Sequence, residues 1–375
     1  MNTKADIFIF AGEQSGDLHG EHLIRLLLQK NPHLKIIGVG GPRMRSVEGF
    51  QCTFPMEKFH VMGFIDVLLA LPKLIYQFYL VKKQIMQSAP KKVLFIDYPD
   101  FNLRLAKSLK KSKFDGKIAH YICPSIWAWR KNRIYLMEKV LDTLFCILPF
   151  EKTYFKDSSL NVKYVGHPLI KRIEEYSYSP LSFAEGKKVV GIFPGSRKKE
   201  IDLNFPFQLD LMKTLAQECP DLLFAISVSH SKFLPLIEEM VEKAGLKDQV
   251  HLVDQNKNYD LMRLCDLAIA KSGTVTLELA LHRVPTVVIY GIAPLDLFIA
   301  RNLLKIRLPF YALPNIIYQN ELFPEFFGPN LTKETLYKAV KYFLFDERAR
   351  NECREKCDQL YNLLKNKDPD GDITL

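Results

Sequence analysis

Two carboxylates three residues apart, Asp97 and Asp100, are the residues of this chain best placed for acid–base chemistry. They follow the apolar run 93–95, which is typical of a buried β-strand. Pro99 cannot continue a strand and favours an extended residue before it, so the sequence predicts that Asp97 lies where the chain leaves the sheet. Ligands bind at that edge of an open parallel sheet, where a carboxylate can act as a general base. The alternative interpretation is that Asp100 caps a helix from about Phe101 to Lys113 and Asp97 only braces the turn.

Two later turns suit an anion. Arg197 lies in a Pro-Gly-Ser-Arg turn after an apolar run, where a guanidinium can clamp a diphosphate with two donors. The segment Ser272-Gly273-Thr274 follows another apolar run and opens a helix, whose free backbone N–H groups attract negative charge. Glu278 follows about one turn into this helix, at the distance where a ribose would extend from a diphosphate.

A glycine-rich turn from Ala11 to Asp17 follows the first apolar run of the chain. Its glycines allow the backbone to approach a ligand closely, but the turn is neither G-x-G-x-x-G nor a phosphate loop. The carboxylates Glu13 and Asp17 argue against simple phosphate binding. They suit hydroxyl groups better, such as those of a sugar.

The segment from Met56 to Ser88 is rich in large apolar residues. One interpretation is two core helices that pack on a sheet. The other is an exposed apolar surface at a membrane interface or around acyl chains, and the pattern leaves both open. That surface would include Met62, Phe64, Val67 and Leu68. Both tryptophans, Trp127 and Trp129, lie beside three cations, a combination that suits a membrane interface or a sugar next to a phosphate.

Strand-like and helix-like segments alternate through most of the chain, which indicates an α/β protein. A change of composition at 176–186 predicts a linker between two Rossmann-like domains, 1–176 and 187–335, that face each other across a cleft. The remaining segment, 336–375, is predicted to be helical and to pack on the first domain or on a partner chain, which leaves a homodimer open.

The composition narrows the class of partner and compartment. A net charge of +10 favours an acidic partner, but zinc-finger spacing and RNP-like strands are absent from the sequence, so nucleic acid is not predicted. Seven scattered cysteines indicate reduced intracellular thiols, and Cys353 and Cys357 lack the further ligands of a metal site. A strand that starts by Ile7 leaves no room for a signal peptide, and polar residues interrupt the longest apolar stretch, so we predict a cytoplasmic protein without a spanning helix.

In their order and spacing, these motifs resemble the lipid-A-disaccharide synthase family along nearly the whole chain. Each motif alone is modest, whereas the ordered set is specific. The matching segments are Ala11–Asp17, Gly41–Met44, Met62–Phe64, Ile96–Asn102, Pro124–Arg130, Leu148–Glu151, Gly166–Pro168, Pro194–Arg197, Ser272–Glu278 and Leu313–Asn315.

The resemblance implies a GT-B fold and an inverting glycosyl transfer by a peripheral protein at the cytoplasmic face of the inner membrane. The donor would be UDP-2,3-diacylglucosamine and the acceptor 2,3-diacylglucosamine 1-phosphate (lipid X). The products would be a β-1,6-linked disaccharide 1-phosphate and UDP, without a metal or other cofactor. Asp97 corresponds to the family's general base for the acceptor 6-hydroxyl, and Glu13 and Ser15 to a loop beside it. The UDP-side residues correspond to Arg197, Ser272, Gly273, Thr274, Glu278 and Asn315.

Two positions depart from the family pattern. Phe326-Phe327-Gly328 stands where a Gln is expected after Glu325, and Asp66 stands where a Glu is expected. The first departure concerns a residue expected to contact the donor, whereas the second keeps the charge. Two rival functions remain from the sequence: a UDP-N-acetylglucosamine 2-epimerase of the same architecture, and a non-catalytic lipid-binding protein.

Overall fold

The computed structural model describes residues 4–59, 64–128, 130–184, 186–298, 302 and 308–366. Within them the chain forms two compact units that divide between Pro168 and Leu169. This boundary precedes the predicted linker at 176–186, because Tyr176 and Tyr178 pack against the hydrophobic core of the second unit. The Tyr176 hydroxyl also donates to Asp260 of that unit.

The described residues of the first unit form a seven-stranded parallel sheet in the order β3-β2-β1-β4-β5-β6-β7. Strand β1 is buried along its whole length, as expected for a parallel sheet covered on both faces. The strands are β1 (Ile7–Ala11), β2 (Ile36–Gly40), β3 (Phe50–Pro55), β4 (Lys92–Ile96), β5 (Lys117–Tyr121), β6 (Thr143–Cys146) and β7 (Asn161–Tyr164).

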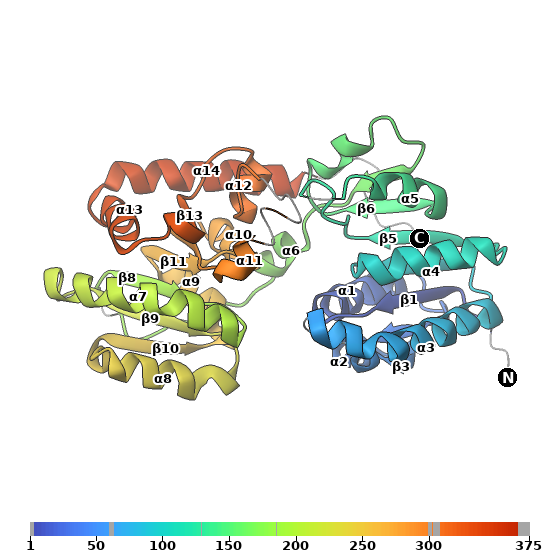
Figure 1. Cartoon of the computed structure of the whole chain (residues 1–375), viewed down its shortest axis with the longest axis horizontal. Coiled ribbons are helices and arrows are strands. Elements are labelled where there is room, and N and C mark those ends of the chain that lie inside the picture. The colour runs from blue at the N-terminus through green and yellow to red at the C-terminus, as the bar shows by residue number, and fades with distance from the viewer. Residues whose placement is uncertain are drawn as a thin grey trace. The chain divides into compact units, whose positions relative to one another are not determined.

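Helices cover both faces of this sheet (Figure 1). Because successive side chains of a strand point to opposite faces, Phe8 and Phe10 of β1 pack in one core, and Ile7 and Ile9 pack in the other. The first core contains residues of α3 (Phe64–Ser88), α4 (Pro99–Lys111) and α5 (Arg133–Val140). The second contains residues of α1 (Gln14–Lys30) and α2 (Pro42–Arg45), and α6 (Pro168–Glu174) starts at the boundary between the units.

The second unit has a six-stranded parallel sheet among its described residues, in the order β10-β9-β8-β11-β12-β13. Its strands are β8 (Val189–Phe193), β9 (Leu223–Val228), β10 (Val250–Asp254), β11 (Leu267–Lys271), β12 (Thr286–Tyr290) and β13 (Glu325–Phe327). Its helices are α7 (Lys198–Glu218), α8 (Leu234–Lys243), α9 (Asn258–Leu264), α10 (Thr274–Leu281), α11 (Pro294–Phe298), α12 (Leu313–Tyr318), α13 (Lys333–Phe345) and α14 (Glu347–Lys365).

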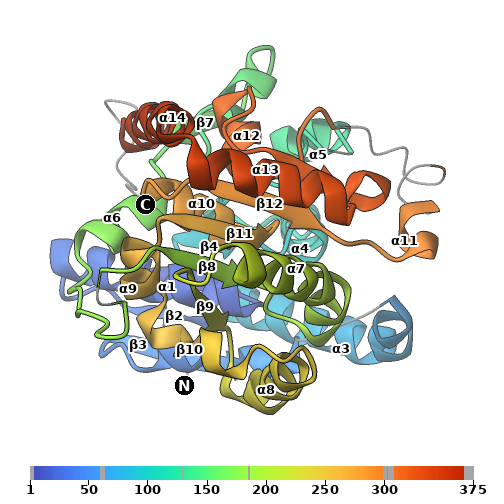
Figure 2. The ribbon, with the colours of Figure 1, turned by 90° about the vertical axis from the view of Figure 1, so that its left-hand side faces the viewer.

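The C-terminal helices belong to this second unit (Figure 2). Helix α13 contacts α7, β11 and β12, and α14 contacts α10, α12 and α13. The buried residues Cys353, Cys357, Leu360 and Leu364 give α14 an apolar stripe at helical spacing. The sequence prediction placed these helices on the first domain or on a partner chain. The described part of the segment instead buries its apolar stripe in its own unit.

In each sheet the strand order reverses beside the first strand of the unit, between β1 and β4 and between β8 and β11. In open α/β sheets, ligands bind outside the carboxyl ends of the strands at such a point. The turns after these four strands carry, in chain order, the predicted Glu13, Asp97, Arg197 and Ser272-Gly273-Thr274. The predicted α/β fold with two Rossmann-like domains is therefore confirmed. Among the described residues, no helix is both long and apolar enough to cross a membrane.

Candidate functional site

Asp97 leaves β4 in a left-handed backbone conformation. Its φ is 49° and that of Tyr98 is 47°, which costs roughly 1–3 kcal/mol for each residue. Two hydrogen bonds hold this turn: the Asp97 N–H donates to the Tyr121 carbonyl at 3.0 Å, and Asn102 Nδ2 donates to the Asp97 carbonyl at 2.6 Å. The sequence prediction of an extended residue before Pro99 was wrong, because these bonds outweigh the local preference.

The Asp97 carboxylate accepts hydrogen bonds from the Ser15 hydroxyl and from the Tyr98 backbone N–H. Ser15 reaches it because β1 and β4 are neighbours, with Ala11 paired to Ile96. Burial raises the pKa of Asp97, and the two hydrogen bonds oppose this rise only in part. The structure thus brings Asp97 and Ser15 together at a strand end, and gives Asp97 a proton affinity above that of an exposed aspartate. This arrangement suits a general base.

The two acidic residues of the turn after β1, Glu13 and Asp17, have different environments. Glu13 is the exposed residue before α1, and its charge adds to the effect of burial in raising the pKa of Tyr98. Asp17 is buried, and its carboxylate accepts from the N–H groups of Gly41 at 2.7 Å and Met44 at 3.1 Å. Asp17 therefore stabilises the start of α2. The prediction that it binds a sugar hydroxyl was wrong, because its oxygens already accept these bonds.

Asp100 pairs with two arginines. Its Oδ1 accepts from Arg130 Nη1 at 2.9 Å and from Arg133 Nη2 at 2.6 Å. Helix α4 starts at Pro99, Tyr98 is its N-cap residue, and no side chain caps it. The interpretation of Asp100 as a cap of a helix beginning at Phe101 is therefore wrong.

The predicted apolar surface is described only in part. Met62 and Trp129 lie outside the described residues, as do the side chains of Phe64, Val67 and Leu68, although these three belong to α3. Trp127 is half-buried, and its ring meets that of Phe150 edge-on at 5.8 Å.

From residue 71 onwards, α3 has two distinct faces. Val81 and Ile85 are buried in the core, whereas four large residues are 46–62% exposed: Leu71, Ile75, Tyr76 and Tyr79. One continuous helix therefore combines the core role and the exposed apolar surface that the sequence left as alternatives. The predicted pair of helices is replaced by a single helix with Pro72 inside it.

The start of α10 is open to a ligand. Gly273 precedes the helix in an extended conformation, and a Cβ placed there would meet nothing closer than Lys271 Nζ at 3.9 Å. Thr274 is exposed, whereas Ser272 is buried and its hydroxyl donates to the Tyr311 carbonyl at 3.1 Å. Among the described residues, the space in front of Gly273 is therefore open, and the N–H groups of a helix start attract an anion.

Two cations lie on adjacent strand ends near this helix. Arg197 follows β8 with a 71% exposed side chain, and Lys271 ends β11 and pairs with Glu200 at 3.0 Å. Burial alone would raise the pKa of Glu200, but the Ser196 N–H and the Lys271 ammonium outweigh it and hold this pKa below its ordinary value. Lys271 and Glu200 were not predicted as site residues, because the only signal for Lys271 in the sequence is its position just before Ser272.

Glu278 and Asn315 are already engaged within the protein. Glu278 accepts from the Tyr259 hydroxyl at 2.9 Å, and its burial raises its pKa. Asn315 is fully buried: Nδ2 donates to the Phe323 carbonyl at 2.8 Å, and Oδ1 accepts from the Phe323 N–H at 2.9 Å. Asn315 thus shapes the 311–325 loop, while a direct contact of either residue with UDP stays a prediction.

Among the described residues, one buried cluster has the donor types of a metal site. Cys123, Cys146 and Glu151 place their ligand atoms within 4.8 Å of one another. Their hydrogen-bonding groups are occupied by the protein, because Glu151 accepts from the Leu148 N–H at 3.1 Å and Cys123 donates to the Pro124 carbonyl. Burial also raises the pKa of Glu151 to about 8, which favours a neutral acid over a charged ligand. We therefore interpret the cluster as structural.

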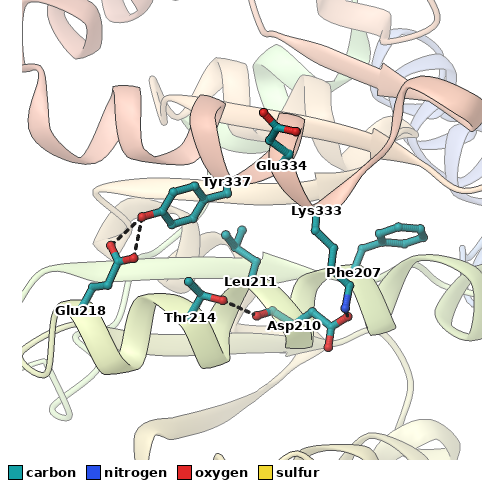
Figure 3. Close-up of a pocket in the computed structure, with 8 residues that line it drawn as sticks. All are labelled: Phe207, Asp210, Leu211, Thr214, Glu218, Lys333, Glu334 and Tyr337. Carbon is teal, nitrogen blue, oxygen red and sulfur yellow. Dashed lines mark hydrogen bonds and ion pairs between the residues drawn. The ribbon is translucent and has the colours of Figure 1, made fainter.

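A pocket of about 390 Å³ lies between α7 and α13 (Figure 3). Its polar groups pair with each other: Tyr337 donates to Glu218 at 2.6 Å, and Lys333 pairs with Asp210 at 2.8 Å. The α7 residues that line it start at Phe207, about 14 Å along the helix from the strand end at its N-terminus. The pocket is therefore separate from the candidate site.

Comparison with known proteins gives one consistent result. A family model described as "Lipid-A-disaccharide synthetase" matches residues 7–370. A lipid-A-disaccharide synthase of Chlamydia trachomatis is 40% identical over 95% of this chain, and this chain spans 59% of the length of that relative. A synthase of the same name from Geobacter sulfurreducens is 33% identical over 92% of this chain and 89% of its own.

Solved structures share the fold at low sequence identity. A putative UDP-N-acetylglucosamine 2-epimerase from Listeria monocytogenes superposes with a TM-score of 0.60 at 12% identity, over 96% of this chain and 94% of that one. A structure named as a glycosyltransferase of kitacinnamycin reaches a TM-score of 0.62 at 10% identity, over 95% and 94% of the two chains. The predicted GT-B fold class agrees with these likenesses.

Proposed function

This chain belongs to the lipid-A-disaccharide synthetase family, and we propose that it joins UDP-2,3-diacylglucosamine to 2,3-diacylglucosamine 1-phosphate by inverting glycosyl transfer. The products are the β-1,6-linked disaccharide 1-phosphate and UDP. The observation that carries this proposal is the buried Asp97 carboxylate at the end of β4, with its raised pKa and its bond from Ser15. The first unit supplies the acceptor side and the second unit the donor side.

Asp97 takes the proton of the acceptor 6-hydroxyl as that oxygen forms a bond to the anomeric carbon of the donor. The bond between this carbon and the UDP oxygen breaks on the opposite face, so the configuration inverts. Burial of Asp97 supports this role, since a base with a raised pKa holds the transferred proton better. Ser15 orients the carboxylate through its hydrogen bond.

The diphosphate gains negative charge as it departs, and groups of the second unit can stabilise this charge. Arg197, Lys271 and the N-terminus of α10 supply two cations and free N–H groups. We propose that Ser272, Gly273 and Thr274 let the diphosphate approach that helix start, with Glu278 toward the ribose. Asn315 supports the UDP side by holding the 311–325 loop.

Acylated substrates require contact with a lipid surface, and the exposed face of α3 supports such contact at the cytoplasmic face of the inner membrane. Replacing Ile75 and Tyr79, which are 50% and 62% exposed, by glutamate should weaken sedimentation with anionic vesicles at least tenfold while UDP binding persists. Tyr342→Glu on α13 is the matched control, since Tyr342 is 55% exposed on the second unit. An equal loss of vesicle sedimentation in the control and in the α3 variants would refute the proposal that α3 contacts the membrane.

The pH dependence of transfer offers a second prediction. The Ser15 hydroxyl stabilises the charged form of Asp97, so Ser15→Ala should raise the pKa of Asp97 further. Because the base must be deprotonated, the acid limb of kcat/KM should move to higher pH, with the largest loss at acidic pH. Ser15→Thr, which keeps a hydroxyl, should restore the limb. An unchanged acid limb of kcat/KM in Ser15→Ala would show that Ser15 does not act on Asp97.

A substrate panel tests the function itself. Purified protein is incubated with UDP-2,3-diacylglucosamine and lipid X, and separately with UDP-N-acetylglucosamine alone. Our proposal predicts UDP release only when both acylated substrates are present. Conversion of UDP-N-acetylglucosamine into its 2-epimer would favour the epimerase alternative, and binding of acylated sugars without turnover would favour a lipid-binding protein.

A further inference from the structure

A fully buried histidine lies next to the turn that carries the proposed base. His120 is the penultimate residue of β5 and is paired with Phe95 of β4 and Leu144 of β6, so it faces the core that contains these two residues. Its side chain is 0% exposed, and both ring nitrogens lack a hydrogen-bond partner among the described residues. An unpaired polar group in a core costs free energy that an apolar residue would avoid. Packing alone therefore does not explain a histidine at this position.

The ring of His120 lies beside the ends of two adjacent strands. Burial lowers the pKa of His120 to about 4, and the backbone groups of Ile122 and Asp97 oppose this fall, so both groups are close to the ring. Ile122 follows β5 with a φ of 74°, and Asp97 follows β4 with a φ of 49°. Such left-handed residues are strained and persist only where the surrounding structure holds them. His120 is thus a neutral ring between two strained turns.

A second buried side chain contacts the Asp97 turn. Asn102 is 0% exposed and donates from Nδ2 to the Asp97 carbonyl at 2.6 Å, while its Oδ1 is unpaired within the described part of the chain. A carbonyl oxygen has two lone pairs, so that of Asp97 can accept from Asn102 and from an imidazole N–H together. Hydrogen bonds at catalytic sites are often long in the free enzyme and tighten in the reacting complex.

We propose that His120 is a positioning residue for Asp97: in the reacting complex its ring donates to the Asp97 carbonyl and, with Asn102, fixes the left-handed turn that aims the carboxylate at the acceptor hydroxyl. This inference rests on the proposed function, in which Asp97 is the base. His120 itself touches no substrate, because it is fully buried. It acts through the backbone of Asp97, whereas Ser15 acts directly on the carboxylate.

The first test is His120→Leu, which removes the polar ring and keeps a side chain of similar size. It should lower kcat about 10- to 100-fold, because a slightly displaced base is far less effective, while KM for both substrates changes less than about twofold. Its melting temperature should equal or exceed that of the wild type, since an unpaired buried group is removed. A joint loss of kcat and stability would show that His120 only packs the core.

Conservative variants and a matched control complete this comparison. The amide nitrogens of His120→Asn and His120→Gln can replace Nδ1 and Nε2 respectively, so one of the two should restore most of kcat. Gln84→Leu is the control, since the Oε1 of Gln84 is also buried and unpaired. Gln84 lies near the end of α3 that leads into the start of β4, at the sheet edge opposite Asp97, so its replacement should leave kcat unchanged. A low kcat in both amide variants would contradict the proposed hydrogen bond.

A double-mutant cycle with Asp97→Asn tests whether His120 acts through Asp97. In the Asp97→Asn background, His120→Leu should lower kcat no further. Thermal unfolding of the same four proteins gives a readout that needs no turnover. The stability that Asp97→Asn gains at neutral pH should shrink in the His120→Leu background, because a relaxed turn lets the carboxylate reach water.

The two readouts separate this inference from the proposed function. An equal fold-loss of kcat in both backgrounds would overturn the inference, and so would an equal stability change of Asp97→Asn in both. Absence of turnover in the wild type would contradict the proposed function, while the unfolding cycle would still show whether His120 holds the Asp97 turn.

Discussion

Asp97→Asn is expected to lower the rate of disaccharide formation about 10³-fold, because an amide cannot accept the proton of the attacking hydroxyl. The asparagine oxygen can still accept the bonds that Ser15 and Tyr98 donate, so the turn should keep its shape. Steady-state rates with both acylated substrates measure the loss. Turnover within threefold of the wild type would show that Asp97 is not the base.

The stability of the same variant serves as its control. Burial raises the pKa of Asp97, so the folded protein binds this proton more tightly than the unfolded chain. The wild type therefore loses stability as the pH rises from the ordinary aspartate pKa through the raised value, because Asp97 ionises over this range. Asp97→Asn lacks this loss and should unfold at the wild-type temperature or above at neutral pH, with UDP binding unchanged. A large drop in melting temperature would instead point to misfolding.

Gly273→Val is expected to weaken UDP binding by at least about tenfold, or ~1.4 kcal/mol, with little change in stability. The backbone of Gly273 is extended, which any residue adopts, and a Cβ there would have open space around it. The side chain would therefore fit the protein but fill the space through which a diphosphate approaches α10. Calorimetry with UDP measures the affinity, and thermal unfolding measures the stability.

Gly273→Ala is an intermediate step between the wild type and Gly273→Val. Its single methyl group should reduce the affinity for UDP less than valine does. Full UDP affinity in Gly273→Val would contradict the placement of the diphosphate at this helix start. A joint loss of affinity and stability would show that the glycine serves the fold.

The parts of the fold that local pattern controls could be predicted from the sequence. Short apolar runs predicted the strands before Asp97, Arg197 and Ser272, and parallel-sheet geometry then placed their turns at the binding edge. The conformation of the Asp97–Tyr98 turn could not be predicted, because Tyr121 and Asn102, which hold it, act from another strand and from the following helix.

The roles of acidic residues depended on contacts that spacing does not reveal. Asp17 belongs to a turn typical of ligand contact, yet its partners are the N–H groups of residues 41–44. Asp100 has the position of a helix cap, yet its partners lie 30 and 33 residues further along the chain. In both cases the tertiary partner decides the role.

The resemblance identified Asn315 as a UDP-side residue, and a fully buried amide with internal hydrogen bonds points to a supporting role for it. No pattern in the sequence predicted the aromatic stack of Tyr290, Phe327 and Tyr311, which lies at the ends of the 311–325 loop. Its rings are 5.3 and 4.2 Å apart and come from three separate segments.

The most direct test of the central claim is the structure of the product formed from UDP-2,3-diacylglucosamine and lipid X. Nuclear magnetic resonance of the purified product determines its linkage and anomeric configuration, and a coupled assay counts the UDP released. We predict one UDP for each β-1,6-linked disaccharide 1-phosphate. An α-linked product, or release of UDP without a disaccharide, would contradict inverting transfer with Asp97 as the base.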